Sequence, residues 1–125
     1  MLYNQALEVC RIANLVCELY IPEKDKQLHM DYYRNDFVKL PSSILPVIAS
    51  AQKSEEYVTK MGIATSIRAK YIKFLDLILF LRWANLIEEE HANAIRIEVT
   101  KFRKIFIDWK NTFERDHSRD EWDLF

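Results

Sequence analysis

The sequence predicts an all-α protein, an up-down-up-down antiparallel four-helix bundle. Apolar residues recur at alternating steps of three and four along most of the chain, which places them on one face of an α-helix. One glycine and three prolines leave little room for the turns of a β-sheet protein. A chain of 125 residues, half of them hydrophobic, can bury a core of its own. We expect the bundle to span residues 1–115 and an acidic tail to span residues 116–125.

The first helix is expected from about Leu2 to Tyr20, because Pro22 disfavours the helical conformation in the residue before it. Its apolar face comprises Leu2, Ala6, Val9, Ala13, Val16 and Tyr20. Three further residues are predicted to widen that face: Ile12, Leu15 and Leu19. Cys10 and Cys17 are two helical turns apart, too far for a disulfide within one helix. We therefore expect two buried thiols.

The second helix is expected from about Leu28 to Lys53, and Pro41 and Pro46 fall inside it. Each proline removes a backbone donor, at a cost of about 3 kcal/mol in a regular helix interior. The sequence therefore predicts a kink or break between residues 39 and 46, with Ser42 or Ser43 capping the restart. The apolar register is unbroken across the prolines: Met30, Tyr33, Phe37, Leu40, Ile44, Val47 and Ala51. The helix is thus expected to continue beyond the break.

The third helix, which is expected to end near Leu86, is apolar on more than one side. Its core face comprises Ala64, Ile67, Tyr71, Phe74, Ile78 and Leu81, and its flanks carry Leu75, Leu77, Leu79, Phe80 and Trp83. A helix that is hydrophobic nearly all round is buried on two sides, and this chain is too short for a large core. We therefore expect one side to pack against a neighbouring protomer. Asp76, Arg82 and Asn85 interrupt the apolar run before it reaches about 20 residues, which argues against a membrane span.

The fourth helix is expected from about Glu88 to Arg115, after a short acidic turn. Its apolar face comprises Ile95, Val99, Phe102, Phe106, Trp109 and Phe113, so Phe106 and Trp109 are predicted to be core residues. The tail that follows is expected to be flexible, and its apolar residues Trp122, Leu124 and Phe125 are candidates for docking on a partner.

No motif for catalysis, a cofactor or a metal ion is found in the sequence. There is no glycine-rich phosphate loop, no histidine pair on one helical turn and no nucleophile elbow. Glu88 and His91 have the spacing of a carboxylate-bridged metal site once, but they fall at a helix start, where a solvated cap is the simpler interpretation. We therefore expect a protein that is not an enzyme. The free thiols and the absence of a signal-peptide pattern predict a cytoplasmic location.

The formal net charge is −1, but positive charge is concentrated in the third and fourth helices. Basic residues exceed acidic residues by three between Lys53 and Arg82, and by three again between Arg96 and Lys110. The candidates for contacts with nucleic-acid phosphates are Lys60, Arg68, Lys70, Lys73, Arg82, Lys101 and Lys104. The alternative for Arg82 is a pairing with Asp76 or with a neighbouring subunit, and the alternative for the whole set is a solvated outer face. A ring of protomers would repeat any basic patch and strengthen it.

Several short sequence motifs occur in a fixed order along the chain. The first helix ends in Ile21-Pro22, the second contains Ser43-Ile44 and Ile48-Ala49, the third contains Leu81-Arg82-Trp83, and the fourth carries Trp109 near its end. Over residues 2–113 the chain resembles the four-helix-bundle family that includes proteins encoded in intervening sequences of bacterial 23S ribosomal RNA genes. Within that family it is most similar to the accessory variability determinant (Avd) proteins of diversity-generating retroelements. Ser50-Ala51 stands where intervening-sequence relatives commonly carry Glu-Gly, which favours the retroelement branch.

The resemblance implies a homopentameric barrel that binds a reverse transcriptase and RNA or DNA, and that supports mutagenic copying of a template RNA. Arg82 and Trp109 occupy positions that match the family pattern. The retroelement proteins are distinctly basic, whereas this chain is slightly acidic, so nucleic-acid binding has to depend on local charge. The alternative is an oligomer of the intervening-sequence type that acts through protein contacts and has no nucleic-acid role.

Overall fold

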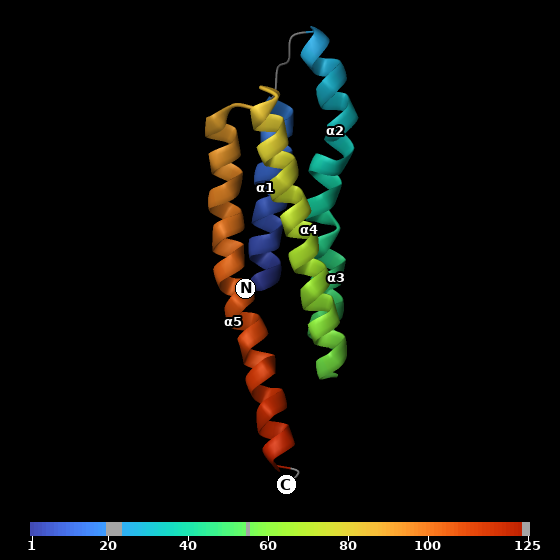
Figure 1. The fold of residues 1–125 in the computed structure, drawn as a ribbon, viewed down its shortest axis with the longest axis vertical. Coiled ribbons are helices and arrows are strands. Elements are labelled where there is room, and N and C mark those ends of the chain that lie inside the picture. Colours follow the sequence, from blue (N-terminus) through green and yellow to red (C-terminus); the bar gives the residue numbers. More distant parts are fainter. Residues whose placement is uncertain (20–23, 55, 124–125) are drawn as a thin grey trace.

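The structure, a computed structural model, describes the backbone of residues 1–19, 24–54 and 56–123 and the side chains of residues 1–18, 33–54 and 56–113. Within these ranges all regular structure is helical (Figure 1). The helices are α1 (Leu2–Leu19), α2 (Lys24–Ser42), α3 (Ile44–Lys53), α4 (Tyr57–Trp83) and α5 (Glu89–Asp123). The prediction of an all-α protein is confirmed for this part of the chain.

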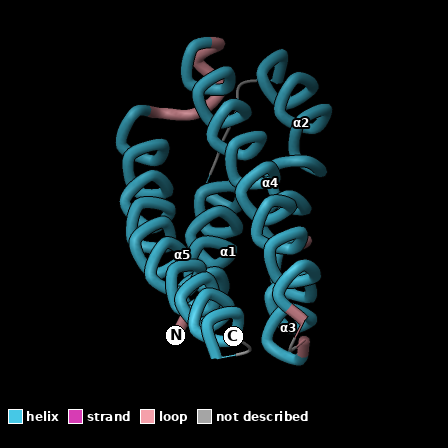
Figure 2. The backbone as a smooth tube through the Cα atoms, turned by 60° about the horizontal axis from the view of Figure 1, so that its bottom comes forward, coloured by secondary structure: helices cyan, strands magenta, loops and turns pink. Residues whose placement is uncertain are grey.

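The helices form a bundle of four rods, because α2 and α3 follow one another along the same side of the molecule (Figures 1 and 2). α4 packs against α5 on one side and against α2 and α3 on the other, and α1 packs against the same three helices. Aromatic pairs join α4 to α5: Tyr57 faces Phe113, with ring centroids 6.4 Å apart, and Tyr71 faces Phe102 at 4.3 Å. A single apolar core therefore lies between the rods.

The apolar faces predicted for the third and fourth helices are buried, with one exception. All six residues predicted for the face of α4 are buried, and Phe74 and Ile78 are fully so. On α5, Ile95, Val99, Phe102, Phe106 and Phe113 are buried. Trp109 is only partly buried and packs against the edge of the core, 4.8 Å from the ring of Phe113. Trp109 is therefore a boundary residue and not the full core residue that the sequence predicts.

On α1 the predicted face is confirmed from Leu2 to Val16, and both cysteines are buried and free. The side chains of Leu19 and Tyr20, which the sequence places on or beside this face, lie outside the described residues. The prediction that Leu15 widens the face is wrong, since its side chain is 41% exposed. Leu15 precedes the buried Val16 by one residue, so it lies about 100° further round the helix.

The break predicted in the second helix occurs at Ser43, between α2 and α3. The chain stays nearly helical there, because the Ser43 backbone N–H donates to the Lys39 carbonyl at 2.8 Å. Phe37, Ile44 and Ala51, seven residues apart, are all buried, so the register is preserved. The predicted serine cap is wrong: the Ser43 hydroxyl donates back to the Leu40 carbonyl at 2.8 Å. α2 begins at Lys24, four residues before the predicted start, and the Met30 side chain lies outside the described residues.

α4 ends at Trp83, three residues before the predicted end, because Asn85 takes a left-handed conformation with φ of 59°. The backbone N–H of Leu86 donates to the Leu81 carbonyl at 2.8 Å, and that of Asn85 donates to the Arg82 carbonyl at 3.0 Å. These two bonds form a Schellman motif, which satisfies carbonyl groups left free at a helix end. Asparagine tolerates the left-handed conformation better than most residues.

α5 continues to Asp123, eight residues beyond the predicted end, and its C-terminal part extends past the other helices (Figure 1). The backbone of residues 116–123 is therefore helical, whereas the sequence analysis ended the fourth helix near Arg115. No glycine or proline interrupts this segment. The Trp122 side chain, Leu124 and Phe125 lie outside the described residues. None of the helices in the described ranges has the length and apolar character needed to cross a membrane.

Replacement of Phe74 by alanine is expected to lower the free energy of unfolding by about 3–5 kcal/mol, because the ring is fully buried. Replacement of Trp109 is expected to cost clearly less, about 1–3 kcal/mol, because part of the indole is already in water. Chemical denaturation of Phe74→Ala and Trp109→Ala tests the order. Equal losses would mean that Trp109 belongs to the core as fully as Phe74 does.

The alkaline stability of the bundle is expected to depend on Cys10, because burial raises the pKa of its thiol from 9.0 to about 11. As the pH rises, the thiol ionises in the unfolded chain before it ionises in the folded chain. The stability that the protonated thiol gives the folded state is therefore complete below pH 9 and is lost as the pH rises to about 11. The free energy of unfolding of the native chain, minus that of Cys10→Ala, should fall by up to about 2–3 kcal/mol over this window. Parallel profiles from denaturation at several pH values would contradict the expectation.

Candidate nucleic-acid interface

The seven basic residues predicted to contact phosphate do not lie on one surface. Lys70 is on the side of α4 that faces the α2–α3 break, where its Nζ donates to the Ser43 hydroxyl at 3.2 Å. Lys73, three residues later, is exposed on the same side. Arg68 lies on the opposite side of α4, where it faces α5 across a groove. The basic residues of α4 are therefore divided between two flanks of the helix.

Lys101 belongs to a polar cluster between α1 and α5. Its Nζ donates to a carboxylate oxygen of Glu98 at 3.1 Å, and the Gln5 amide donates to the other oxygen at 2.8 Å. A hydrogen bond from Arg11 lowers the pKa of the neighbouring Glu8 carboxyl, and the positive charge of Lys101 contributes to the same shift. Lys101 is thus partly neutralised by its surroundings. Lys104 is exposed and has no ion pair with any described residue.

The ends of the boundary between α4 and α5 carry two more of the predicted residues. Arg82 lies 3.9 Å from a carboxylate oxygen of Glu89, across the turn that joins the two helices. The predicted pairing with Asp76 is not found, because Glu89 is the partner within the chain. At the other end, Lys60 Nζ lies 5.8 Å above the ring of Phe113, within the range of a cation–π contact.

A row of basic residues runs along the α4–α5 boundary, and we call it the basic seam. Arg68 and Arg103 line the same groove, and Lys110 lies beside them. Arg96 is seven residues before Arg103 and so falls on the same face of α5, two turns away. The basic seam comprises Arg68 and Arg82 on α4 and Arg96, Arg103 and Lys110 on α5.

The prediction from sequence omitted three members of the basic seam, Arg96, Arg103 and Lys110, although all three contribute to the local charge. The signal that identifies them is spacing. Residues 96, 103 and 110 are separated by seven, and residues 68 and 82 by fourteen, so each set keeps one position relative to the buried face of its helix. A count of charge over a stretch of chain ignores the direction in which each side chain points.

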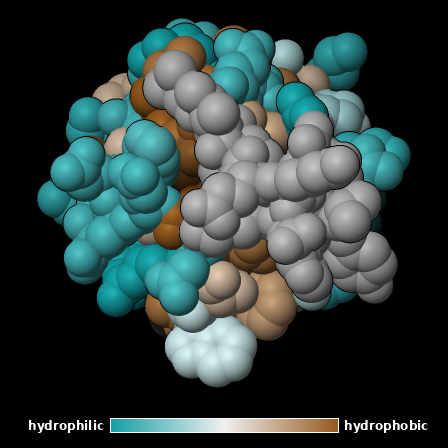
Figure 3. Space-filling model, turned by 90° about the horizontal axis from the view of Figure 1, so that it is seen from above, coloured by the Kyte–Doolittle hydropathy of each residue, from teal (hydrophilic) through white to brown (hydrophobic). Residues whose placement is uncertain are grey.

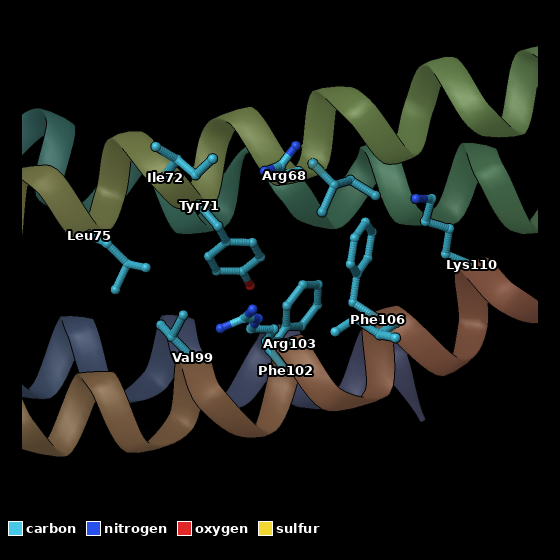
Figure 4. Close-up of a pocket in the computed structure, with 11 residues that line it drawn as sticks. Arg68, Tyr71, Ile72, Leu75, Val99, Phe102, Arg103, Phe106 and Lys110 are labelled. Carbon is cyan, nitrogen blue, oxygen red and sulfur yellow. The ribbon is translucent and has the colours of Figure 1, made fainter.

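The groove beneath the basic seam has a volume of about 390 Å³ and lies between α4 and α5 (Figure 4). Its walls are mostly apolar, from Ile67, Ile72, Leu75, Val99, Phe102, Phe106 and Ile107, and its cations are Arg68, Arg103 and Lys110. A smaller hollow of about 210 Å³ shares Arg68, Ile72, Phe106 and Lys110 and extends the groove towards Met61. An apolar recess with cations at its edge suits a ligand that is both apolar and anionic.

One polar group beneath the wall of the groove has no hydrogen-bond partner among the described residues. Tyr71 is only 6% exposed, and its hydroxyl oxygen is buried, with no hydrogen-bond partner in the part of the chain that the structure describes. The side chain projects from α4 between the two helices, and the hydroxyl points towards α5, in the interior behind the groove (Figure 4). Burial raises the pKa of Tyr71, as does the nearby Cys10 thiol, so the hydroxyl remains a donor at neutral pH. A buried hydroxyl without a partner is uncommon in folded proteins.

A second surface feature is an apolar patch at the C-terminal end of α4, formed by Leu79, Phe80 and Trp83. Trp83 is 80% exposed and Leu79 is 55% exposed. Phe80 lies between the rings of Trp83 and Tyr33, with centroids 6.3 and 5.1 Å away. Viewed from the end of the bundle where α4 joins α5, hydrophobic residues reach the surface between hydrophilic ones (Figure 3). Large exposed side chains gathered in this way are typical of a protein contact.

The function has to be inferred from these two surfaces. Comparisons of the chain with protein-family models, with curated proteins and with solved structures give no match. Among the described side chains, no group of three or more His, Cys, Asp or Glu residues is arranged to hold a metal ion.

Proposed function

We propose that this chain is a non-enzymatic, oligomeric nucleic-acid-binding protein that serves a diversity-generating retroelement as an accessory to its reverse transcriptase. The basic seam is the observation that carries the nucleic-acid part of this proposal. The retroelement, the reverse transcriptase and the mutagenic copying of a template RNA come from the family resemblance alone.

The chemistry of the basic seam suits a phosphate backbone. Four of its five cations are arginines, whose planar guanidinium groups donate several hydrogen bonds to phosphate oxygens. Arg68 and Arg103 are exposed, and neither forms an ion pair with a described residue. Residues seven apart on a helix are separated by about 10 Å, so the cations follow an extended anionic chain along the boundary. Such contacts bind phosphate without reading the base sequence.

The overall charge of −1 does not argue against this surface, because Arg82, at one end of it, is the only seam arginine that forms an ion pair with a described carboxylate, that of Glu89. Glu98 and Glu8 belong to the polar cluster between α1 and α5, and three consecutive glutamates lie at the turn before and at the start of α5. Several copies of the basic seam in one oligomer would add their attraction for the same strand. The oligomer is therefore an essential part of the proposal.

The apolar patch of Leu79, Phe80 and Trp83 supports the oligomer. These side chains extend the hydrophobic surface of α4 away from the core of its own chain, as expected for a helix that also packs against a neighbouring protomer. We propose an up-down-up-down bundle as the repeating unit, and the ring pairs between α4 and α5 fit an antiparallel pair. The number of five subunits is taken from the family resemblance.

The alternative is an oligomer of the intervening-sequence type, which acts through protein contacts only. The same apolar patch favours it, because that patch needs no nucleic acid to explain it. The two functions differ in what they require of the basic seam. Loss of a seam cation affects the first function and leaves the second intact.

Replacement of Arg103 by glutamate is expected to weaken nucleic-acid binding by about tenfold or more, because it reverses a charge in the middle of the basic seam. Lys104→Glu, the matched control, makes the same charge change on the next residue, outside the groove. The control is expected to weaken binding by less than about threefold, through long-range charge alone. Filter binding to RNA and DNA at about 50 and 200 mM salt measures both variants. If the native chain shows no affinity at the lower salt, the proposal is wrong and the alternative stands.

Replacement of Trp83 by aspartate is expected to dissociate the oligomer, because it puts a charge into the apolar patch. Val58→Asp is the control, since Val58 is also exposed and lies near the other end of the same helix. Sedimentation velocity at micromolar concentration should give an oligomer for the native chain and the control, and a smaller species for Trp83→Asp. A native chain that sediments as a monomer would rule out both the oligomer and the pentamer.

A further inference from the structure

One face of α5 carries basic residues inside the bundle and acidic residues beyond it, and we call this row the α5 charge stripe. Its members recur at alternating steps of four and three, so they hold register positions on one face of the helix. In order they are Arg103, Ile107, Lys110, Glu114, His117 and Glu121. The first three line the groove between α4 and α5. The last three belong to residues 114–123, which we call the α5 extension. The α5 charge stripe therefore changes sign along its length.

The α5 extension leaves the bundle as part of one continuous helix. Tyr57, the first residue of α4, faces Phe113 of α5 with ring centroids 6.4 Å apart, so the boundary between the two helices ends there. Residues 114–123 add about 15 Å of helix past the other helices (Figure 1). Because α5 runs unbroken from Glu89 to Asp123, the α5 extension cannot turn back onto the groove of its own chain. A second molecule is needed to bring an acidic segment to the basic half of the stripe.

Opposite charges at the two ends of one stripe make α5 complementary to a second copy of itself. In an antiparallel pair with a two-fold axis beside residue 112, Arg103 lies opposite Glu121 of the second copy. Lys110 then lies opposite Glu114 of the second copy, and the symmetry repeats each pair. We propose that two copies of this chain associate in this way, each α5 extension lying along the basic half of the other copy's α5 charge stripe.

The charges on both sides of this contact are complementary. The α5 extension carries five acidic and two basic residues. Arg103 is exposed and forms no ion pair with a described residue, and Arg68 of α4 lines the same groove. A parallel pair in register would place Arg103 opposite Arg103 and Glu121 opposite Glu121. Because like charges placed opposite one another repel, the stripe selects the antiparallel orientation and fixes its register.

The contact is governed by charge, because ion pairs at a protein surface are weak singly and are screened by salt. Ile107, in the middle of the basic half, is 43% exposed, so pairing also removes apolar surface from water. The apolar patch of Leu79, Phe80 and Trp83 lies at the other end of α4, so both contacts can form in one assembly.

Pairing of two copies covers part of the basic seam. Arg68, Arg103 and Lys110 all lie along the groove that receives the second copy's α5 extension. The pair therefore excludes a nucleic-acid strand from this part of the basic seam, and a strand that binds there separates the pair. Only this competition rests on the proposed function, and the contact between the two copies does not.

Disulfide formation between two full-length variants tests the register. Arg103→Cys and Glu121→Cys are mixed in a glutathione buffer at about 50 mM salt, where a cross-linked dimer is expected that about 500 mM salt suppresses. Each variant alone should give little dimer, because its new cysteines lie about 27 Å apart along the antiparallel pair. The native cysteines, Cys10 and Cys17, are buried.

Lys104→Cys mixed with Glu121→Cys is the matched control. Lys104 is exposed and follows Arg103 directly, so it lies about 100° round the helix from the stripe. The yield of cross-linked dimer from the Arg103→Cys mixture should exceed that of the control by about fivefold or more. Equal yields would mean that the thiols meet by random collision and would overturn the inference.

Exchange of the charges tests the ion pairs themselves. In a Trp83→Asp background, which removes the contribution of the apolar patch, Glu121→Arg should weaken self-association by about threefold or more. Addition of Arg103→Glu should restore it, because the pair forms again with its signs exchanged. Lys104→Glu in place of Arg103→Glu has the same net charge and should restore nothing. Sedimentation velocity at about 50 mM salt measures all four chains. Self-association that Glu121→Arg leaves unchanged, or that both double variants restore equally, would overturn the inference.

Single-stranded RNA separates this inference from the proposed function. RNA at a saturating concentration should suppress the cross-link between Arg103→Cys and Glu121→Cys, and Glu121→Gln should raise the affinity for RNA by about two- to fivefold. A cross-link that saturating RNA leaves unchanged would overturn the competition. A native chain that binds no RNA at about 50 mM salt would overturn the proposed function, while the cross-link would still establish the contact between the two copies.

Discussion

Burial of the apolar face of α4 is the interaction on which the rest of this structure depends. α4 contacts α2, α3 and α5, and Ile67, Phe74 and Ile78 on its face are fully inaccessible to solvent. Each side chain of this kind contributes about 1.5–3 kcal/mol when it leaves water. Because the face is fixed in the core, every other position on the helix is fixed as well. Ile67 and Tyr71 are buried and lie between Arg68 and Lys70 around the circumference of the helix. Arg68 is therefore turned towards α5, and Lys70 is turned towards the α2–α3 break.

The same register explains how much of the fold was predictable. The spacing of apolar residues identified the core of α4 and nearly all of α5, since packing and pattern agree there. It was less reliable at the boundaries. Leu15 lies too far from the centre of its face, and the early end of α4 depends on the backbone conformation of one residue, Asn85. The continuation of α5 beyond Arg115 was missed because the acidic composition of that segment was considered and its lack of helix-breaking residues was not.

The candidate site was predictable only in part, because charge was counted along the chain and not around each helix. Arg68 and Arg82 were identified from sequence, and both lie on the α4–α5 boundary. Lys70 and Lys101 had the same formal charge, but each is engaged with a neighbour away from that boundary. The direction in which a basic side chain points follows from the number of residues between it and the nearest buried position on the same helix. The groove itself has no signature in the sequence, since it depends on how closely two helices approach.

Tyr71 is the position at which packing and hydrogen bonding make different demands on this fold. Phenylalanine would fill the same place in the core, stack on Phe102 and leave no polar atom unsatisfied. A buried hydroxyl without a partner costs about 1–3 kcal/mol, a large fraction of the net stability of a small domain. The fold needs the ring but not the oxygen. Nothing in the described part of the chain donates to or accepts from this oxygen, so its cost to the free protein is not offset by a hydrogen bond.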